Sequence, residues 1–121
     1  MTIGSVLRIY TVLTNPPKTK IVLCVGGHMF LWFNTDARKG RPAQMPVKAG
    51  EAPGITRDCF LDCGRATTFS AREMASAVVC GVVDNPFLQR VIEEVEQRAS
   101  SLPQGQRKTI CAAMREAMTR P

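Results

Sequence analysis

The stretch AVVCGVVDNPFLQRVIEEV, residues 77–95, contains the change of hydrophobic period that decides the fold. Its first half is a short valine-rich run of the kind found in β-strands. Asn85 followed by Pro86 is a typical helix start, with Asn85 as the N-cap. Its second half has apolar residues at helical spacing, namely Leu88, Val91, Ile92 and Val95. We therefore expect a strand-rich body over residues 1–84 and a helical segment over residues 85–121.

The length and composition indicate one globular domain, residues 1–121, with 45% hydrophobic and 21% charged residues. No apolar run approaches the roughly 20 residues that cross a bilayer, so no membrane association is expected. The first residues have no basic segment before an apolar core, which argues against a signal peptide. We expect a cytoplasmic protein.

Short apolar runs divided by glycine and proline predict a mostly antiparallel body. The first strand is expected over residues 3–13, with Ile3, Val12 and Leu13 in the core, and it ends at the prolines that follow. Gly26 and Gly27 predict a hairpin turn with positive φ. The other expected strands are residues 20–25, 29–33, 44–47, 58–63 and 77–83, and Trp32 and Phe33 should lie on opposite faces of their strand.

Three helices are expected after the central strands. Ser70 and Glu73 have the spacing of a capping box, which predicts a short helix ending near Ala75. Two longer helices are expected over residues 85–100 and 103–118. The second should bury one face that carries Ile110, Ala113, Met114 and Ala117. The expected fold class is therefore mainly β, a small β-barrel with C-terminal α-helices.

The cysteines and the single histidine do not predict a metal site. Five cysteines, an odd number in apolar surroundings, are expected to be reduced core residues. Cys24, His28, Cys59 and Cys63 could supply four zinc ligands, but Cys59 and Cys63 would lie about 13 Å apart along a strand. One histidine in the chain also excludes catalysis by two imidazoles.

The positive charge is concentrated in the strand-rich body. Residues 1–65 contain nine basic and four acidic residues, a net charge of +5, whereas residues 66–121 have a net charge of +1. A basic surface raises the local concentration of polyanions, so nucleic acid is the first partner to consider. The alternative is a solvated surface that only aids solubility.

Basic and polar residues near the expected strand ends are the candidate site. No glycine-rich phosphate loop, nucleophile elbow or pair of catalytic carboxylates is present. Metal-free phosphodiester chemistry needs cations for the charge that grows on the phosphoryl oxygens, and Lys18, Lys20 and Arg57 could supply them. A long polar segment over residues 36–54 adds Arg38, Lys39 and Arg41. The alternative is that these are ordinary loop charges.

Several of these segments resemble the MazF/PemK-type toxins. Residues 4–14, the Pro16-Pro17-Lys18 turn and the strand after it are similar to the start of that fold. The family is also similar to this chain in further segments, namely residues 30–35, residues 56–63 and the two closing helices. The resemblance implies an SH3-like barrel and a homodimer. It also implies a metal-independent endoribonuclease of the mRNA interferase type, acting on single-stranded RNA, that is neutralised by an antitoxin.

The resemblance implies site residues only in part. The family has a catalytic arginine before a proline at the start of its second strand, where this chain has Lys18-Thr19-Lys20. Lys18, Lys20 and Thr35 are therefore expected to be catalytic, without metal or other cofactor. The residues expected to bind RNA are Arg38, Lys39, Arg41, Thr56 and Arg57. The alternatives are a catalytically silent barrel that binds a protein or nucleic acid, and an adaptor whose helices dimerise.

Overall fold

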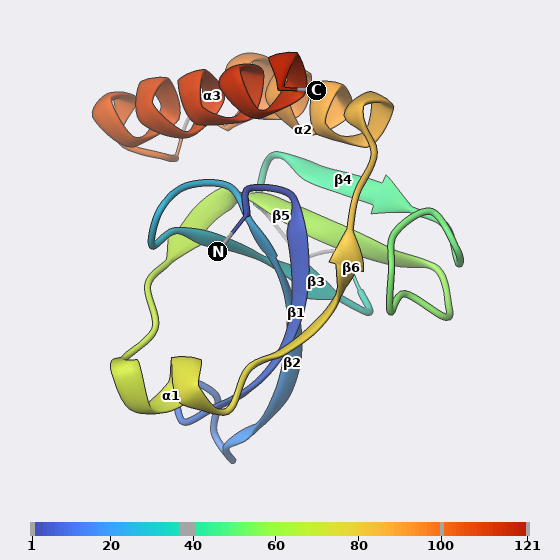
Figure 1. Ribbon diagram of the computed structural model, residues 1–121, viewed down its shortest axis with the longest axis vertical. Coiled ribbons are helices and arrows are strands. Elements are labelled where there is room, and N and C mark those ends of the chain that lie inside the picture. Colours follow the sequence, from blue (N-terminus) through green and yellow to red (C-terminus); the bar gives the residue numbers. More distant parts are fainter. Residues whose placement is uncertain (1, 37–40, 100, 121) are drawn as a thin grey trace.

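A computed structural model describes residues 2–36, 41–99 and 101–120 of the chain (Figure 1). Six strands form one antiparallel sheet with the order β4-β5-β3-β2-β1-β6. Along the chain the elements are β1 (Ser5–Thr11), β2 (Lys18–Cys24), β3 (Phe30–Asn34), β4 (Gln44–Val47), β5 (Cys59–Thr67), α1 (Ala71–Ala75), β6 (Val78–Val82), α2 (Asn85–Arg98) and α3 (Gln104–Thr119). The expected combination of an antiparallel sheet with helices at the C-terminal end is confirmed.

The sheet buries apolar side chains on both faces. Val6, Leu23 and Phe33 belong to a core shared with α2 and α3, and the alternate residues Leu7 and Ile9 belong to a smaller core beside α1. Figure 1 shows α2 and α3 together at one end of the molecule and α1 at the other. The helical stripe is buried as expected, at Phe87, Leu88, Val91, Ile92 and Val95 of α2 and at Ile110, Cys111 and Met114 of α3. Ala113 and Ala117 are only half-buried.

Helix capping agrees with the sequence at α1 and differs by one residue at α2. Ser70 and Glu73 form the expected capping box, with Ser70 Oγ accepting a hydrogen bond from the Glu73 amide at 3.1 Å. The N-cap of α2 is Asp84, not Asn85, and its carboxylate accepts a hydrogen bond from the Phe87 amide at 2.9 Å. Asn85 instead donates its side-chain amide to the Met118 carbonyl at 3.1 Å, which links α2 to α3.

The sheet is open, so the expectation of a closed barrel is wrong. Within the described residues its edge strands, β4 and β6, do not hydrogen-bond to one another. Pro46 of β4 has no amide proton to donate, and its carbonyl accepts a hydrogen bond from Arg90 of α2 at 2.7 Å. The edge of β4 is therefore occupied by a helix side chain at the point where a closing strand would have to pair.

The loop between β4 and β5 crosses the gap between the two edges. A Cβ placed on Gly81 of β6 would lie only 2.8 Å from Pro53 Cβ, and one placed on Gly54 would lie 3.0 Å from Cys80 Sγ. Both glycines have positive φ, +152° at Gly81 and +77° at Gly54. The two sheet edges are thus joined by close packing of a loop, not by a strand ladder.

Most expected strands are present, with two local differences. The hairpin between β2 and β3 forms and is closed by Val25 N donating to Met29 O at 3.0 Å, but Gly26 and Gly27 do not have positive φ. Val12 and Leu13 follow the end of β1 and are 66% and 54% exposed, so only Ile3 of the three expected core residues packs against the core. The chain turns away from the sheet after Thr11. No helix in the described part of the chain is long and apolar enough to cross a membrane.

Candidate nucleic-acid interface

The candidate site lies where β2 and β3 separate. Their pairing runs from Cys24 opposite Phe30 to Val22 opposite Trp32. Beyond that pair, β2 continues back to Lys18 and β3 continues to Asn34, and Figure 1 shows the two strands diverging. Side chains at the diverging ends line two cavities, and Asn34 borders both of them.

The first hollow, which we call the Arg57 cavity, has a volume of about 270 Å³. Its walls come from the start of β2, the end of β3 and the loop that precedes β5. It is lined by Thr19, Lys20, Ile21, Phe33, Asn34, Thr35, Gly54, Ile55, Thr56, Arg57 and Cys59. The described lining thus combines three threonines and two cationic residues with apolar side chains.

An exposed aromatic residue extends the Arg57 cavity across β1. Tyr10 lies directly opposite Thr19, and Arg8 lies directly opposite Ile21, in the ladder between β1 and β2. Opposite residues share a face of an antiparallel sheet, so Tyr10 and Arg8 lie on the same face as two residues that line the cavity. Tyr10 is 52% exposed. A flat aromatic ring and a cation therefore flank the cavity.

The second hollow, which we call the Lys18 cavity, has a volume of about 320 Å³ and lies toward the other face of the sheet. It is lined by Leu13, Thr14, Asn15, Lys18, Trp32, Asn34, Arg41, Asp62 and Arg65. Asp62 is 5% exposed and accepts hydrogen bonds from Gln44 Nε2 at 2.9 Å and from the Gly64 amide at 3.1 Å. Arg41 lies 3.9 Å from its other oxygen.

Lys20 stands between the two cavities. It contributes to the lining of the Arg57 cavity, but its ammonium lies 3.3 Å from Asn34 Oδ1 and 5.7 Å from the centre of the Trp32 ring. Trp32 belongs to the side of the sheet that holds the Lys18 cavity, and it stacks on Phe69. The charge of Lys20 is thus directed toward the second cavity, while its stem borders the first.

The structure brings together four of the residues expected at the site. Thr35, Thr56 and Arg57 line the Arg57 cavity with Lys20, whereas Lys18 and Arg41 line the Lys18 cavity. The expected catalytic residues Lys18, Lys20 and Thr35 are therefore not gathered in one cavity. Arg38 and Lys39 lie outside the described residues.

Sequence reasoning missed four residues that border the cavities. They are Arg8 and Tyr10 beside the Arg57 cavity, and Arg65 and Asp62 in the Lys18 cavity. The sequence of β1 could have indicated the first two, because Arg8 and Tyr10 are polar residues at alternate positions of an otherwise buried strand and therefore share one face. No local pattern marks Arg65 or Asp62, because both reach the cavity through the pairing of β5 with β3.

The cysteines do not form a common metal site. Cys24 belongs to the core beside α1, whereas Cys59 and Cys63 belong to the core beside α2 and α3, and His28 is exposed. All five cysteines are free thiols. Burial raises the pKa of Cys59, which lines the Arg57 cavity, and the neighbouring Asp58 carboxylate raises that pKa further. Cys59 is therefore a neutral thiol near pH 7 and a poor nucleophile.

Comparison of the chain with protein-family models, with curated proteins and with solved structures finds no match. Function is therefore inferred from the geometry of the chain's own residues.

Proposed function

We propose that the protein binds single-stranded RNA through the Arg57 cavity and the adjoining face of β1. The observation that carries this proposal is that Thr35, Thr56 and Arg57 converge with the stem of Lys20 on one cavity beside the exposed ring of Tyr10. Cations that follow the phosphates, together with an aromatic surface for bases, are the usual means of binding single strands.

Single-stranded RNA fits this arrangement better than a duplex does. Tyr10 can stack only on a base that has left its helix, because the bases of a duplex are already stacked on each other. The threonine hydroxyls at positions 19, 35 and 56 can donate to phosphates or accept from ribose 2′-hydroxyls. Arg57, which lines the cavity, and Arg8, two residues from Tyr10 on β1, can neutralise phosphates of the bound strand.

Cleavage of the bound RNA, as in the toxins that the sequence resembles, is a second candidate. Among the described residues that line the Arg57 cavity, none is a carboxylate or an imidazole that could remove a proton from a 2′-hydroxyl. Binding without cleavage, by a silent relative of such toxins, therefore has more support. A homodimer and an antitoxin partner remain predictions.

The test is fluorescence anisotropy with an unstructured, labelled RNA oligonucleotide at low salt. We expect saturable binding that Tyr10→Ala and Arg57→Gln each weaken by about tenfold. Arg120→Gln is the matched control, because it removes one exposed cation from the end of α3 and should change affinity little. A duplex of the same sequence should compete poorly. Equal binding by the wild type and by both site variants would contradict the proposal.

A further inference from the structure

We propose that the Lys18 cavity is a separate anion site that takes a phosphate monoester. It is distinct from the RNA surface proposed above, because its lining lies toward the opposite face of the sheet and, in the described parts of the chain, shares only Asn34 with the Arg57 cavity. The ligand class follows from the charge of the lining, from its cationic donors and from the volume of the cavity.

The charge of the lining matches a dianion. Of the lining residues that the structure describes, Lys18, Arg41 and Arg65 supply three positive charges and Asp62 supplies one negative charge, which leaves a net charge of +2. A phosphate monoester carries about −1.5 to −2 near pH 7, whereas each phosphodiester in an RNA chain carries only −1. The ammonium of Lys20, held 3.3 Å from Asn34 Oδ1, adds positive potential beside the cavity.

The cations of the cavity are available for a ligand. Among the described residues, the side chains of Lys18 and Arg65 have no ion-pair partner, and Arg41 lies at 3.9 Å from a carboxylate that Gln44 and Gly64 already hold. Asp62 is thereby fixed as a structural acceptor that orients Arg41. Two or three cations can then converge on one phosphate group, which favours charge-assisted hydrogen bonds.

An aromatic side chain forms part of the same wall. Trp32 lines the cavity with its ring, whereas its indole N–H is buried and presents no surface to a ligand. Stacking on Phe69, with ring centres 6.1 Å apart, holds the indole in place.

Two sources could supply this phosphate. One is a free mononucleotide or another small phosphorylated metabolite, and the other is the 5′-terminal phosphate of an RNA strand. The cavity volume, about 320 Å³, is at the lower end of the range for small-molecule sites. The shared chemistry, a terminal dianionic phosphate, is what the lining recognises.

The experiment uses Trp32, the only tryptophan of the chain, as an internal probe. The full-length protein is titrated with adenosine monophosphate, inorganic phosphate and adenosine in phosphate-free buffer, and binding is followed by tryptophan emission and by equilibrium dialysis. We expect saturable binding of the two phosphates and none of adenosine. Lys18→Gln and Arg65→Gln should each weaken binding by about tenfold, with far-UV circular dichroism as the folding control.

Matched variants keep this test independent of RNA binding. Arg57→Gln and Tyr10→Ala should bind adenosine monophosphate like the wild type even though they bind RNA weakly. If a 5′-phosphorylated oligonucleotide binds more tightly than its 5′-hydroxyl form, and Arg65→Gln removes the difference, the RNA end is the source. If adenosine monophosphate binds and the two oligonucleotides do not differ, the source is a small metabolite. Failure of both phosphates to bind, or equal binding of adenosine, would overturn the inference.

Discussion

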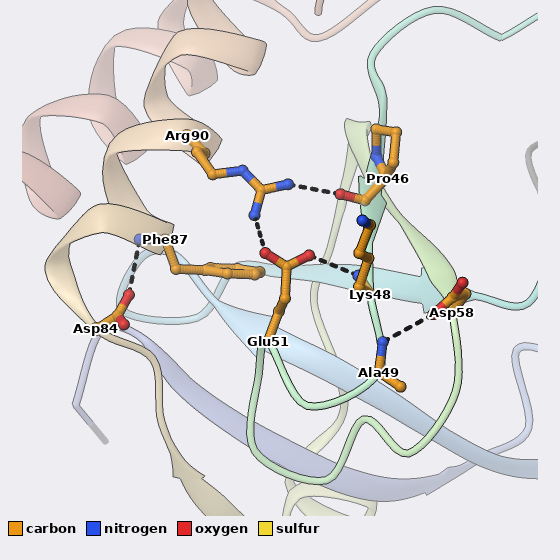
Figure 2. Close-up of polar contacts among 8 residues, drawn as sticks. All are labelled: Pro46, Lys48, Ala49, Glu51, Asp58, Asp84, Phe87 and Arg90. Atoms are coloured by element: carbon orange, nitrogen blue, oxygen red, sulfur yellow. Dashed lines mark hydrogen bonds and ion pairs between the residues drawn. The ribbon is translucent and has the colours of Figure 1, made fainter.

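Arg90 Nη1 of α2 lies 2.8 Å from Glu51 Oε2, and this ion pair ties the helical layer to the loop that forms one wall of the Arg57 cavity (Figure 2). The second arm of the same guanidinium donates to the Pro46 carbonyl at 2.7 Å. The other oxygen of Glu51 accepts from the Lys48 amide at 2.7 Å. One arginine therefore fixes the edge strand β4 and the start of the loop after it.

Replacing Arg90 should loosen this loop. Arg90→Ala removes the ion pair and the hydrogen bond to Pro46, and both are partly solvated, so we expect a loss of about 1 kcal/mol in the free energy of unfolding. Arg90→Lys keeps the charge but cannot bind both acceptors as a fork, so its loss should be smaller. Urea denaturation measures both, with Arg120→Ala as a surface control. Equal stability of Arg90→Ala and the wild type would show that the loop is held by packing alone.

Acid should weaken the contact between α1 and β1. The hydrogen bond from Thr11 Oγ1 at 2.5 Å, supported by those from Ser70 and Val12, holds the pKa of Glu73 below its ordinary value. A carboxyl whose pKa is lower in the folded state stabilises the protein above its unfolded pKa, near 4.5, and this stability is lost as the pH falls through the folded pKa.

The measurement is the urea midpoint at pH 6 and at about pH 3.5. Glu73→Gln should show a smaller difference between the two midpoints than the wild type. It should not abolish the difference, because hydrogen bonding from Lys48 and the charge of Arg90 also lower the pKa of Glu51. Glu93→Gln, on the exposed face of α2, is the matched control. An unchanged difference in Glu73→Gln would contradict this assignment.

Gly81 should tolerate no side chain. Its φ of +152° is unfavourable for alanine, and a Cβ there would lie 2.8 Å from Pro53 Cβ and 2.9 Å from Pro53 Cγ. We expect Gly81→Ala to lower the free energy of unfolding by about 1–3 kcal/mol. Gly27→Ala is the control, because its Cβ would meet nothing within 4 Å. If both variants unfold at the same urea concentration, the loop does not pack on β6 as described.

Local pattern predicted the elements, and long-range contacts decided how they join. The capping box at Ser70 and the apolar stripe of α2 were predicted because they depend on neighbours within one or two turns. The open sheet was not predicted, because its edges are occupied by contacts between residues far apart in sequence, such as the hydrogen bond from Arg90 to the Pro46 carbonyl, 44 residues away. Asp84 and Asn85 are equally good N-caps by residue type, and only the distant Met118 carbonyl distinguishes them.

The candidate site was predicted in part for a similar reason. Thr35 follows β3 and Arg57 precedes β5, so antiparallel pairing of these strands brings them to one end of the sheet. Lys18 and Thr35 were also expected together, but alternation along the strands directs them to cavities toward opposite faces. The pairing of β1 with β2, which places Tyr10 beside Thr19, could not be read from spacing alone.

The salt dependence of RNA binding should separate the roles of cation and ring. Two phosphate contacts, from Arg8 and Arg57, would give a slope near −1.4 in log K against log salt, at roughly −0.7 per contact. Arg57→Gln should reduce that slope by about 0.7, whereas Tyr10→Ala should weaken binding by about 1–3 kcal/mol per base that stacks on it and leave the slope unchanged. Filter binding across a salt series measures both quantities.

The same RNA can be incubated with the protein to test whether it is cleaved. If Lys20 stabilises charge in a transition state, the wild type should cleave the RNA and Lys20→Ala should not. The same variant should bind the RNA only several-fold more weakly than the wild type. The expected result for a binding protein is salt-dependent binding by the wild type with intact RNA. If the wild type cleaves the RNA and Lys20→Ala does not, the protein is an endoribonuclease, even though Lys18 and Thr35 line two different cavities. A slope near zero with Arg57→Gln unaffected would place the RNA elsewhere, because phosphate contacts at the Arg57 cavity cannot form without releasing counterions.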